Sequence, residues 1–456
     1  MRVNISNKAL IITICCLLFA IYIFSATDFE YLAQISIIMF VISLVMFVAS
    51  PIPAALVALL ILTMGILLGL PKSLLFGSFE QDIIWLMIGA FIISAMLEQS
   101  GLIHRMSQWI LNQGHTRKMN RIIFLAAQVI CIVIPSTSSR AVMLLPLYQQ
   151  LATKLPHHKT FYSLFFPTLI LMGSNLTLLG AGSHLIGMGL LESQGQKSLS
   201  YFEFLFFGAP FGIVIAIISM MIIKLFTKMQ HTKIQSQVKK LEKQYTNSEK
   251  KALFIIIVTI LLWLTEWVHH MDIAILTFFI ALLIMLPALN LLSFKQGLKY
   301  INWSLIFFVA AASALGSLLV EYKVIDELQQ SLFNSLTDAQ WMNELTIILT
   351  IIFISVLSHI LITSHTTRAV VLIPGFLMLA EIFQLNTTAT VFFALIGMNY
   401  CLTFPVSSKS ILVFYEAEAG FTSKQLLKLS MILTPIYMGL MLIFYYCYWS
   451  PLGLTL

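Results

Sequence analysis

The chain has 456 residues, of which 59% are hydrophobic and only 10% are charged, and its formal net charge is +7. This is more apolar surface than a soluble domain can bury and too little charge to cover the rest, so the composition excludes a soluble protein and predicts a polytopic protein of the lipid bilayer. Most of the basic excess lies in a few connecting loops, as membrane topology requires, and it does not indicate a nucleic-acid partner.

Eleven apolar runs have about the 17–25 residues that a helix needs to cross a hydrocarbon core of about 30 Å. The first run follows Arg2 and Lys8 and ends in small residues, which also fits a secretory signal, but its length and the polytopic remainder favour a first transmembrane helix. The expected spans are 9–26, 32–49, 54–70, 83–100, 161–190, 204–227, 252–269, 272–290, 301–320, 388–415 and 425–449.

Two further pairs of apolar segments, 122–134 with 139–153 and 345–362 with 367–381, are each interrupted by a short tip rich in serine and threonine. Each half is too short to span comfortably, so each pair is expected to form a re-entrant hairpin whose tip stops near the midplane. The two tips are nearly the same, because the eleven residues from Ser136 and the eleven from Ser364 share six identities.

The charged residues between these runs predict one orientation. The basic loops, expected on the cytoplasmic side of a bacterial-type inner membrane together with the N-terminus, are 101–121, 224–251 and 291–300. The acidic loops, expected outside, are 27–31, 265–273 and 321–344, with Lys72 as a mild exception. The first hairpin then enters from the cytoplasm and the second from outside, which is the pattern of an inverted repeat.

This pattern predicts an all-α polytopic membrane protein of about eleven transmembrane helices plus two re-entrant hairpins. The basic linker 228–251, which joins the two halves of the chain, could lie on the inner leaflet as an amphipathic helix or be a solvated connector. The expected parts are a lead helix 1–30, a first repeat 31–227 with hairpin 122–153 and broken helix 161–190, a linker 228–251, and a second repeat 252–450 with hairpin 345–381 and broken helix 388–415.

The two tips carry the chemistry of an anion site. A dianion at the bilayer centre needs hydrogen-bond donors and positive potential, and each tip offers hydroxyls and the free N–H groups of a helix start. The alternative is that these hydroxyls bond back to their own helix. The tip residues expected to contact the substrate are Ser136, Thr137, Ser138, Ser364, His365 and Thr366.

Arg140 and Arg368 follow the first serine of each tip by one helical turn. They are expected to complete the anion site as guanidinium forks, or alternatively to hold each hairpin in place through backbone carbonyls or an acidic partner such as Glu98. His365 stands where the first tip has Thr137, and at this place a functional role is favoured over simple packing.

The second element of each half is a helix interrupted by polar and small residues, at 173–184 and 399–410. Glycines in the first segment and Pro405 in the second predict that the backbone unwinds there and closes the site opposite the tips, with carbonyls free to coordinate a cation. The alternative is a kinked helix with close packing. In the second segment, Ser408 is expected to contact the substrate.

These features together resemble the divalent anion:sodium symporter family, within a superfamily of inverted-repeat elevator proteins, over residues 30–450. Family members carry Ser-Asn-Thr in each tip, and the matching residues here are 136–138 and 364–366. Pro135, Arg140 and the Ser-His-Thr-Thr tip are more similar to the branch of citrate:succinate and plastid oxoglutarate:malate exchangers.

The resemblance implies a scaffold, a moving transport region and a homodimer. It also implies two sodium sites; carried over, Ser136, Thr137 and Gly180 would form one, and Ser364, His365 and Ser407 would form the other. Both signature asparagines and the usual sodium loops are missing here. In their place the chain has His184, His365 and Lys409, which can carry positive charge where sodium would sit. Exchange or proton coupling therefore rivals sodium symport.

The leading functional prediction is a secondary carrier of di- or tricarboxylates such as succinate, malate or citrate, with no cofactor beyond sodium as a coupling ion. An inorganic anion permease for a sulfate-like ion would use the same donors. A cation:proton antiporter is disfavoured because Glu98 is almost the only carboxylate in the predicted membrane cores. An enzyme is not expected, since the adjacent histidine pairs 157–158 and 269–270 lack metal-ligand spacing.

Overall fold

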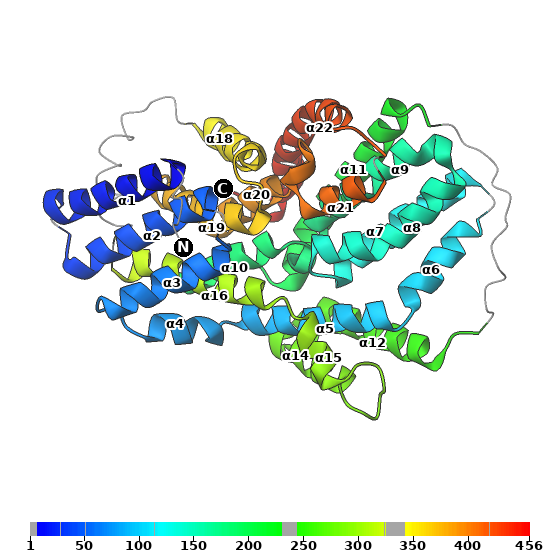
Figure 1. Ribbon diagram of the computed structural model, residues 1–456, viewed down its shortest axis with the longest axis horizontal. Coiled ribbons are helices and arrows are strands. Elements are labelled where there is room, and N and C mark those ends of the chain that lie inside the picture. The colour runs from blue at the N-terminus through cyan, green and yellow to red at the C-terminus, as the bar shows by residue number, and fades with distance from the viewer. Residues whose placement is uncertain are drawn as a thin grey trace.

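The computed structural model describes residues 7–27, 29–50, 52–113, 115–229, 244–322, 324, 343–418 and 420–456. This part of the chain is built from helices and contains no β-strand, which confirms the predicted all-α class. Figure 1 shows an elongated molecule with α1, α2 and α3 towards one end of its long axis and α6, α7 and α8 towards the other. Most of the basic linker and the acidic loop 321–344 lie outside the described residues.

The helices follow the eleven predicted spans closely. α12 and α14 differ most. α12 runs from Asn247 to Leu264 where 252–269 was predicted, and α14 ends at Ile284 although the apolar run continues to 290; Pro287 disfavours helical geometry in the residue before it. The spans are α1 (Asn7–Ala26), α2 (Tyr31–Ala49), α3 (Ala54–Leu67), α5 (Asp82–Gln99), α9 with α10 (Lys159–Gly173, Gly182–Ser193), α11 (Tyr201–Phe226), α12 (Asn247–Leu264), α14 (Ile273–Ile284), α16 (Trp303–Glu321), α20 with α21 (Thr387–Met398, Lys409–Glu418) and α22 (Ser423–Phe444).

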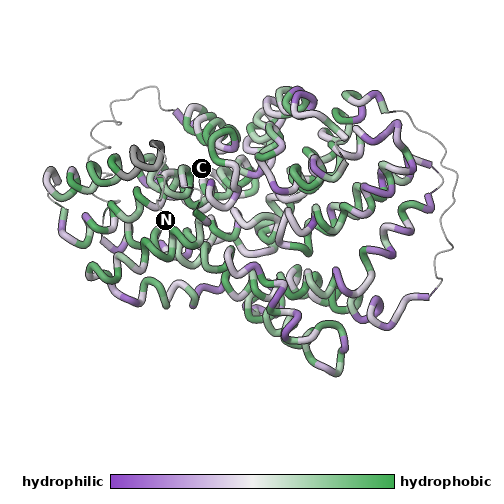
Figure 2. Tube along the Cα trace, viewed as in Figure 1, coloured by the Kyte–Doolittle hydropathy of each residue, from purple (hydrophilic) through white to green (hydrophobic). Residues whose placement is uncertain are grey.

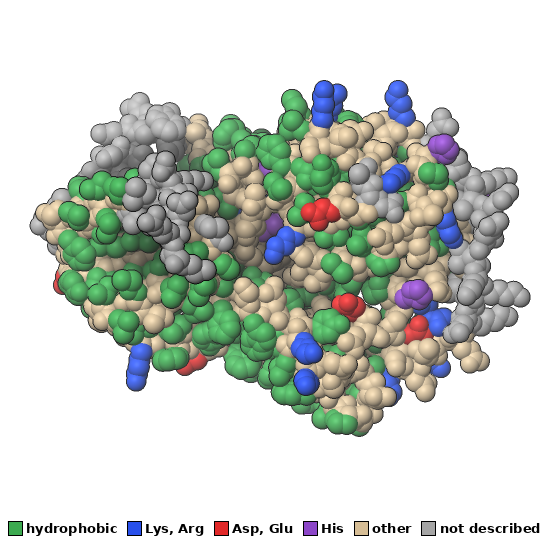
Figure 3. All heavy atoms as spheres, in the orientation of Figure 1, with side chains coloured by type: hydrophobic (Ala, Val, Ile, Leu, Met, Phe, Trp, Pro, Cys, Tyr) green, Lys and Arg blue, Asp and Glu red, His purple; other side chains and the backbone are tan. Residues whose placement is uncertain are grey.

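By length and hydropathy, five helices of the described residues can each cross a membrane unbroken, or six if the bent pair of α15 (Phe294–Tyr300) and α16 counts as one span. Many of the other spans are shorter or interrupted. Figure 2 shows long hydrophobic stretches along the helices, and Figure 3 shows hydrophobic side chains over much of the visible face. Leu60, Met64 and Leu67 of α3 are 58%, 64% and 82% exposed, as expected for a helix that faces lipid.

Each predicted hairpin consists of two helices joined by a short tip. The first is α7 (Thr116–Val133) with α8 (Thr137–Lys154), and the second is α18 (Glu344–Leu357) with α19 (His365–Ile382). Three of these limbs have 18 residues and are longer than predicted. In the first hairpin, polar residues at the outer ends continue the helices beyond the apolar segments.

The two repeats are packed crosswise at the centre of the molecule. The second half of each broken helix lies against the hairpin of the other repeat: α10 packs on α19, and α21 packs on α8. Almost every residue of α9, α10 and α20 is buried, and these helices are apolar on all sides, which is the pattern of helices enclosed by protein. This crossing brings both tips and both unwound segments together.

A short amphipathic helix, α6 (Leu102–Leu111), lies between α5 and the first hairpin, where only a loop was predicted. Arg105 of α6 binds the start of α12: its Nε donates to Glu249 Oε1 at 2.8 Å and a terminal nitrogen donates to the Gln244 carbonyl at 2.8 Å. Its guanidinium also lies 4.6 Å from the centre of the Tyr245 ring. The arm that leads into the first hairpin is thus held to the end of the segment joining the two repeats.

We expect Glu249→Gln to lower the thermal stability of the purified protein at pH 7, by the equivalent of roughly 1–3 kcal/mol for a charge-assisted hydrogen bond. The hydrogen bond from Arg105 holds the pKa of Glu249, which precedes the apolar run of α12, below its usual value. Its contribution is therefore present above the ordinary carboxyl pKa and is lost as pH falls through the lowered pKa.

The melting temperatures of wild type and variant, measured in detergent across pH, should accordingly converge on acidification. Glu80→Gln, at an exposed carboxylate, is the matched control and should have no such effect. A constant difference at every pH would contradict this role of the Arg105–Glu249 pair.

Candidate functional site

Both hairpin tips meet at one cavity of about 300 Å³, here called the tip cavity. The predicted substrate residues line it, apart from the two arginines. The lining comprises Pro135, Ser136, Thr137 and Ser138 of the first tip, Thr363, Ser364, His365 and Thr366 of the second, Ala181, Gly182, Val406, Ser408 and Lys409 of the unwound segments, and Asn302 and Leu305 at the start of α16.

Four helices begin at the tip cavity. Thr137 and His365 open α8 and α19, and Gly182 and Lys409 open α10 and α21, the second halves of the broken helices. The N-terminus of an α-helix carries roughly half a positive charge and unpaired N–H donors. Four such ends around one small cavity create a strong preference for an anion.

The tip serines are helix caps that keep a proton to donate. Ser136 Oγ accepts from the Ser139 N–H at 3.3 Å, and Ser364 Oγ accepts from the Thr367 N–H at 3.3 Å. A hydroxyl that accepts in this way retains its own O–H for a ligand. Ser364 also exchanges a hydrogen bond with Thr366 Oγ1 at 3.0 Å. Within the described chain, neither capping serine donates to a carbonyl of its own helix, contrary to the alternative of back-bonding.

The charge around the tip cavity is positive. Its lining contains no aspartate or glutamate among the described residues, and it contains Lys409, whose side chain is exposed. Lys409 is the first residue of α21, the place that Gly182 occupies in α10. The two halves of the site therefore differ, with a cation on one unwound segment and no side chain on the other.

Arg140 does not line the cavity. Its side chain is fully buried beneath the first tip, where the guanidinium donates to the carbonyls of Ile134 at 2.8 Å and Cys131 at 3.1 Å and to Ser174 Oγ at 3.0 Å. These bonds join the tip to the unwound segment after α9. Of the two roles considered for Arg140, this geometry supports holding the hairpin in place. The hydrogen bonds described for Arg140 go to carbonyls and a serine hydroxyl, and none of them goes to Glu98.

Arg368 is likewise fully buried and outside the cavity lining. It donates to the Tyr400 carbonyl at 3.1 Å and to His365 Nδ1 at 3.0 Å, so it holds the second tip to the second unwound segment. Neither arginine forms an ion pair within the described chain. Both therefore add positive charge behind the tips, outside the lining of the cavity.

Some of the candidate sodium residues line the tip cavity and others lie outside its lining. Ser136, Thr137 and Ser364 line the tip cavity, whereas Gly180 and Ser407 are buried outside its lining. The Ser407 hydroxyl accepts from the Phe404 N–H at 3.2 Å. A Cβ at Gly180 would overlap the Ser174 carbonyl, so glycine at this position has a steric reason of its own.

Of the three residues expected to replace sodium charge, His365 and Lys409 line the cavity and His184 does not. His184 is buried between the two repeats, with Nδ1 2.9 Å from the Thr177 carbonyl and Nε2 2.6 Å from Asn399 Nδ2. The sequence did not predict Asn302, Leu305 or Val406 as site residues. Asn302 and Leu305 lie at the start of α16, whose own sequence has no signal for a ligand.

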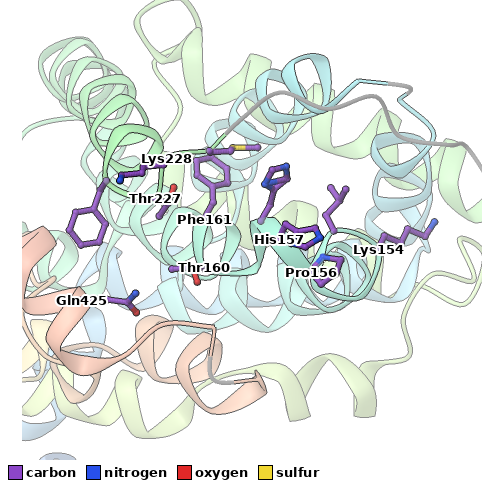
Figure 4. A pocket seen from close by; sticks show the side chains of 12 residues that line it. Lys154, Pro156, His157, Thr160, Phe161, Thr227, Lys228 and Gln425 are labelled. Carbon is purple, nitrogen blue, oxygen red and sulfur yellow. The ribbon is translucent and has the colours of Figure 1, made fainter.

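Three larger cavities contain none of the predicted site residues, and the smallest of them, of about 440 Å³, is lined mostly by apolar side chains of α5, α6, α7 and α12. One, of about 740 Å³, lies at the outer end of the first hairpin, and Figure 4 shows Thr227 and Lys228 on one side of it and Pro156 and His157 on another. Another, of about 930 Å³, is bordered by acidic residues that include Asp82, Glu192 and Glu266. The tip cavity differs from it because the described lining of the tip cavity holds no carboxylate.

An all-helical membrane protein with an anion-favouring cavity between two matching hairpin tips fits the class of secondary anion transporters. The chain matches the family described as "Sodium:sulfate symporter transmembrane region" over residues 4–455, and it belongs to this family. A membrane protein of Cupriavidus necator is 19% identical over 393 residues, which cover 83% of this chain and 76% of that protein. The crystal structure of the YdaH transporter of Alcanivorax borkumensis has a similar fold, with a TM-score of 0.60, 12% identity, and coverage of 84% of this chain and 89% of that one.

Proposed function

We propose that this chain carries small divalent organic anions, di- or tricarboxylates such as succinate, malate or citrate, across a bacterial-type cytoplasmic membrane, with its N-terminus in the cytoplasm. The observation that carries this proposal is the meeting of four helix N-termini and the tip hydroxyls at one cavity whose described lining holds a lysine and no carboxylate. Each N-terminus favours negative charge, and two opposed tips suit a ligand with two separated anionic groups.

The substrate contacts in this proposal are Ser136, Thr137 and Ser138 from one side and Ser364, His365, Thr366 and Ser408 from the other. Arg140 and Arg368 act behind them as positioning residues with long-range positive charge. The cavity of about 300 Å³ is at the lower end of the roughly 300–1,000 Å³ found for small-molecule sites. That size admits a short dicarboxylate as well as a compact tetrahedral ion.

The transport step that we propose is an elevator-like movement of the hairpins and broken helices against the remaining helices. The crosswise packing of α10 on α19 and of α21 on α8 supports it, because it ties both hairpins into one body. Two copies are proposed to associate through the scaffold helices. Exchange or proton coupling is favoured over sodium symport, because Lys409 lines the cavity and places a cation where sodium-coupled relatives carry a sodium loop.

A sulfate-like permease is the second candidate, and the description of the family favours it directly. Uptake of labelled succinate by purified protein in liposomes tests the choice, with and without internal dicarboxylate and with and without a sodium gradient. Uptake that needs internal substrate but no sodium supports exchange, and sodium-driven uptake into empty vesicles contradicts the coupling proposal. Uptake of sulfate without succinate or citrate would replace the first candidate by the second.

We expect Ser136→Ala and Ser364→Ala each to reduce succinate uptake at least tenfold and to remove the thermal stabilisation that succinate gives. Each variant loses a direct donor, and each also loses a helix cap of about 1 kcal/mol. Ser293→Ala is the matched control, because Ser293 caps α15 through the same 3.3 Å bond from the third helical N–H but lies away from the cavity. If both tip variants fold and keep full uptake and stabilisation, the tip cavity is not the substrate site.

A further inference from the structure

Three histidines lie buried or half-buried around the second tip and the unwound segments, and the hydrogen bonds of each decide whether it can accept a second proton. They are His184, His359 and His365. A neutral imidazole has one donor nitrogen and one acceptor nitrogen, whereas the protonated ring has two donors. The group that faces the acceptor nitrogen therefore determines whether the second N–H of the protonated ring finds a hydrogen-bond acceptor.

The hydrogen bonds of His184 and His365 fit the neutral ring and not the positive charge that the sequence predicted for them. When His184 Nδ1 donates to the Thr177 carbonyl, its Nε2 must accept from Asn399 Nδ2, and that amide also donates to Asn175 Oδ1 at 2.8 Å. His365 Nδ1 faces a nitrogen of Arg368, which can only donate. A second proton on either ring would face a donor.

His359 differs because its partner can reverse. The ring is 1% exposed and lies one turn before the second tip; Nδ1 donates to the Val356 carbonyl at 2.6 Å and Nε2 lies 2.6 Å from Thr403 Oγ1. Thr403 Oγ1 is 2.8 Å from Ser430 Oγ, which is 3.1 Å from the Tyr400 hydroxyl. Each of these hydroxyls can donate or accept.

This chain of hydroxyls can form hydrogen bonds with the ring of His359 in both its neutral and its protonated state. With neutral His359, Thr403 donates to Nε2, Ser430 donates to Thr403, and Tyr400 donates to Ser430. With protonated His359, Nε2–H donates to Thr403 and every bond reverses. The displaced hydroxyl protons then have an acceptor, because the Ser430 carbonyl lies 3.2 Å from the Tyr400 hydroxyl and 2.8 Å from Thr434 Oγ1.

We infer that His359 is the site of a proton that is bound together with the substrate. The inference rests on the proposed function and names the coupling ion of the same site. Only a proton enters and leaves: neutral imidazole takes up H⁺ to become imidazolium, and no covalent bond of the substrate changes. The hydroxyl chain supplies the rearrangement that this change requires.

The charges near His359 make the proton depend on the substrate. Burial of the ring and the positive charge of Arg368 on α19 both oppose protonation of His359. The other titratable groups facing this region are His365 on α19, Tyr400 and Cys401 in the unwound segment and Tyr437 on α22, and none of these is a carboxylate. A dianion bound at the tips offsets this positive field. Bound substrate therefore strengthens the binding of the proton at His359, and by linkage the bound proton strengthens the binding of the substrate by the same factor.

The test measures proton uptake when succinate binds to the purified protein, by calorimetry at pH 6–8 in buffers of different ionisation enthalpy. Wild type should take up about one proton per succinate, and His359→Gln about none while still binding succinate. Thr403→Val, which keeps the ring but removes its reversible partner, should also lose the uptake. His157→Gln, at a histidine outside the site, is the control and should behave as wild type.

The outcomes separate this inference from the proposed function. The assignment to His359 is overturned if wild type binds succinate without taking up a proton. It is also overturned if proton uptake is unchanged in both His359→Gln and Thr403→Val. Either result leaves the carrier proposal intact. Failure of wild type to bind succinate, citrate or sulfate overturns both. In liposomes, an inward proton gradient should raise succinate accumulation several-fold in wild type and not in His359→Gln.

Discussion

Arg140→Lys is expected to abolish uptake although the positive charge is kept. The guanidinium of Arg140 joins the tip carbonyl of Ile134, the Cys131 carbonyl and the Ser174 hydroxyl from one fully buried position. A lysine ammonium is a single point on a flexible chain and cannot reach these acceptors in their separate directions. Two or more charge-assisted hydrogen bonds are then lost, each of roughly 1.5–3 kcal/mol, and buried carbonyls are left unpaired.

Liposome uptake and melting temperature in detergent check this prediction together. We expect at least a hundredfold loss of uptake and a clear fall in melting temperature, because about 3 kcal/mol corresponds to more than a hundredfold in an equilibrium. Arg121→Lys, on the exposed face of the same hairpin, is the matched control. Normal uptake by a folded Arg140→Lys protein would mean that only the charge matters.

Arg368→Lys should be less harmful than Arg140→Lys. Arg368 binds the Tyr400 carbonyl and His365 Nδ1, and its Nε has no hydrogen-bond partner among the described residues. The second tip therefore depends on fewer bonds from its arginine than the first. Equal losses from the two lysine variants would show that the repeated arginines do the same work in both halves.

The fold was largely predictable from the sequence because its strongest signals are long and repeated. Apolar runs located the spans, and the two matching tips located the hairpins and the residues that meet at the cavity. The crosswise packing explains why tips 228 residues apart in sequence, at Ser136 and Ser364, can serve one site. The helix α6 was not predicted because its ten residues include charged and polar side chains, which are typical of a loop. Only the packing of its buried face identifies it as a helix.

The direction of the arginine side chains was not predictable. One helical turn after the tip, Arg140 is able to reach either into the cavity or back to the Ile134 carbonyl, and the spacing is the same in both cases. The choice depends on where the unwound segment around Ser174 and Leu179 lies, which is a tertiary feature. His359 was missed for a similar reason, because its partners Thr403 and Ser430 come from other elements and carry no motif.

Gly180→Ala is the second substitution for which we expect a large effect, and its cause is steric. A Cβ at this position would overlap the backbone carbonyl of Ser174, which cannot rotate away as a side chain can. Overpacking typically costs about 1–3 kcal/mol and more where backbone must move. Moving Ser174 would also disturb its hydroxyl, which accepts from Arg140 at 3.0 Å, so the damage should reach the first tip.

The melting temperature and succinate uptake of Gly180→Ala should therefore both fall, and uptake should fall equally with and without sodium. Gly375→Ala is the matched control: it adds the same methyl group inside α19, where no atom lies within 4 Å, and alanine favours a helix over glycine by about 0.5–1 kcal/mol. That control should match or exceed wild type in stability. A Gly180→Ala protein that melts normally and loses only a sodium-dependent part of its uptake would instead identify the Gly180 backbone as a sodium ligand, and the coupling proposed for this carrier would be wrong.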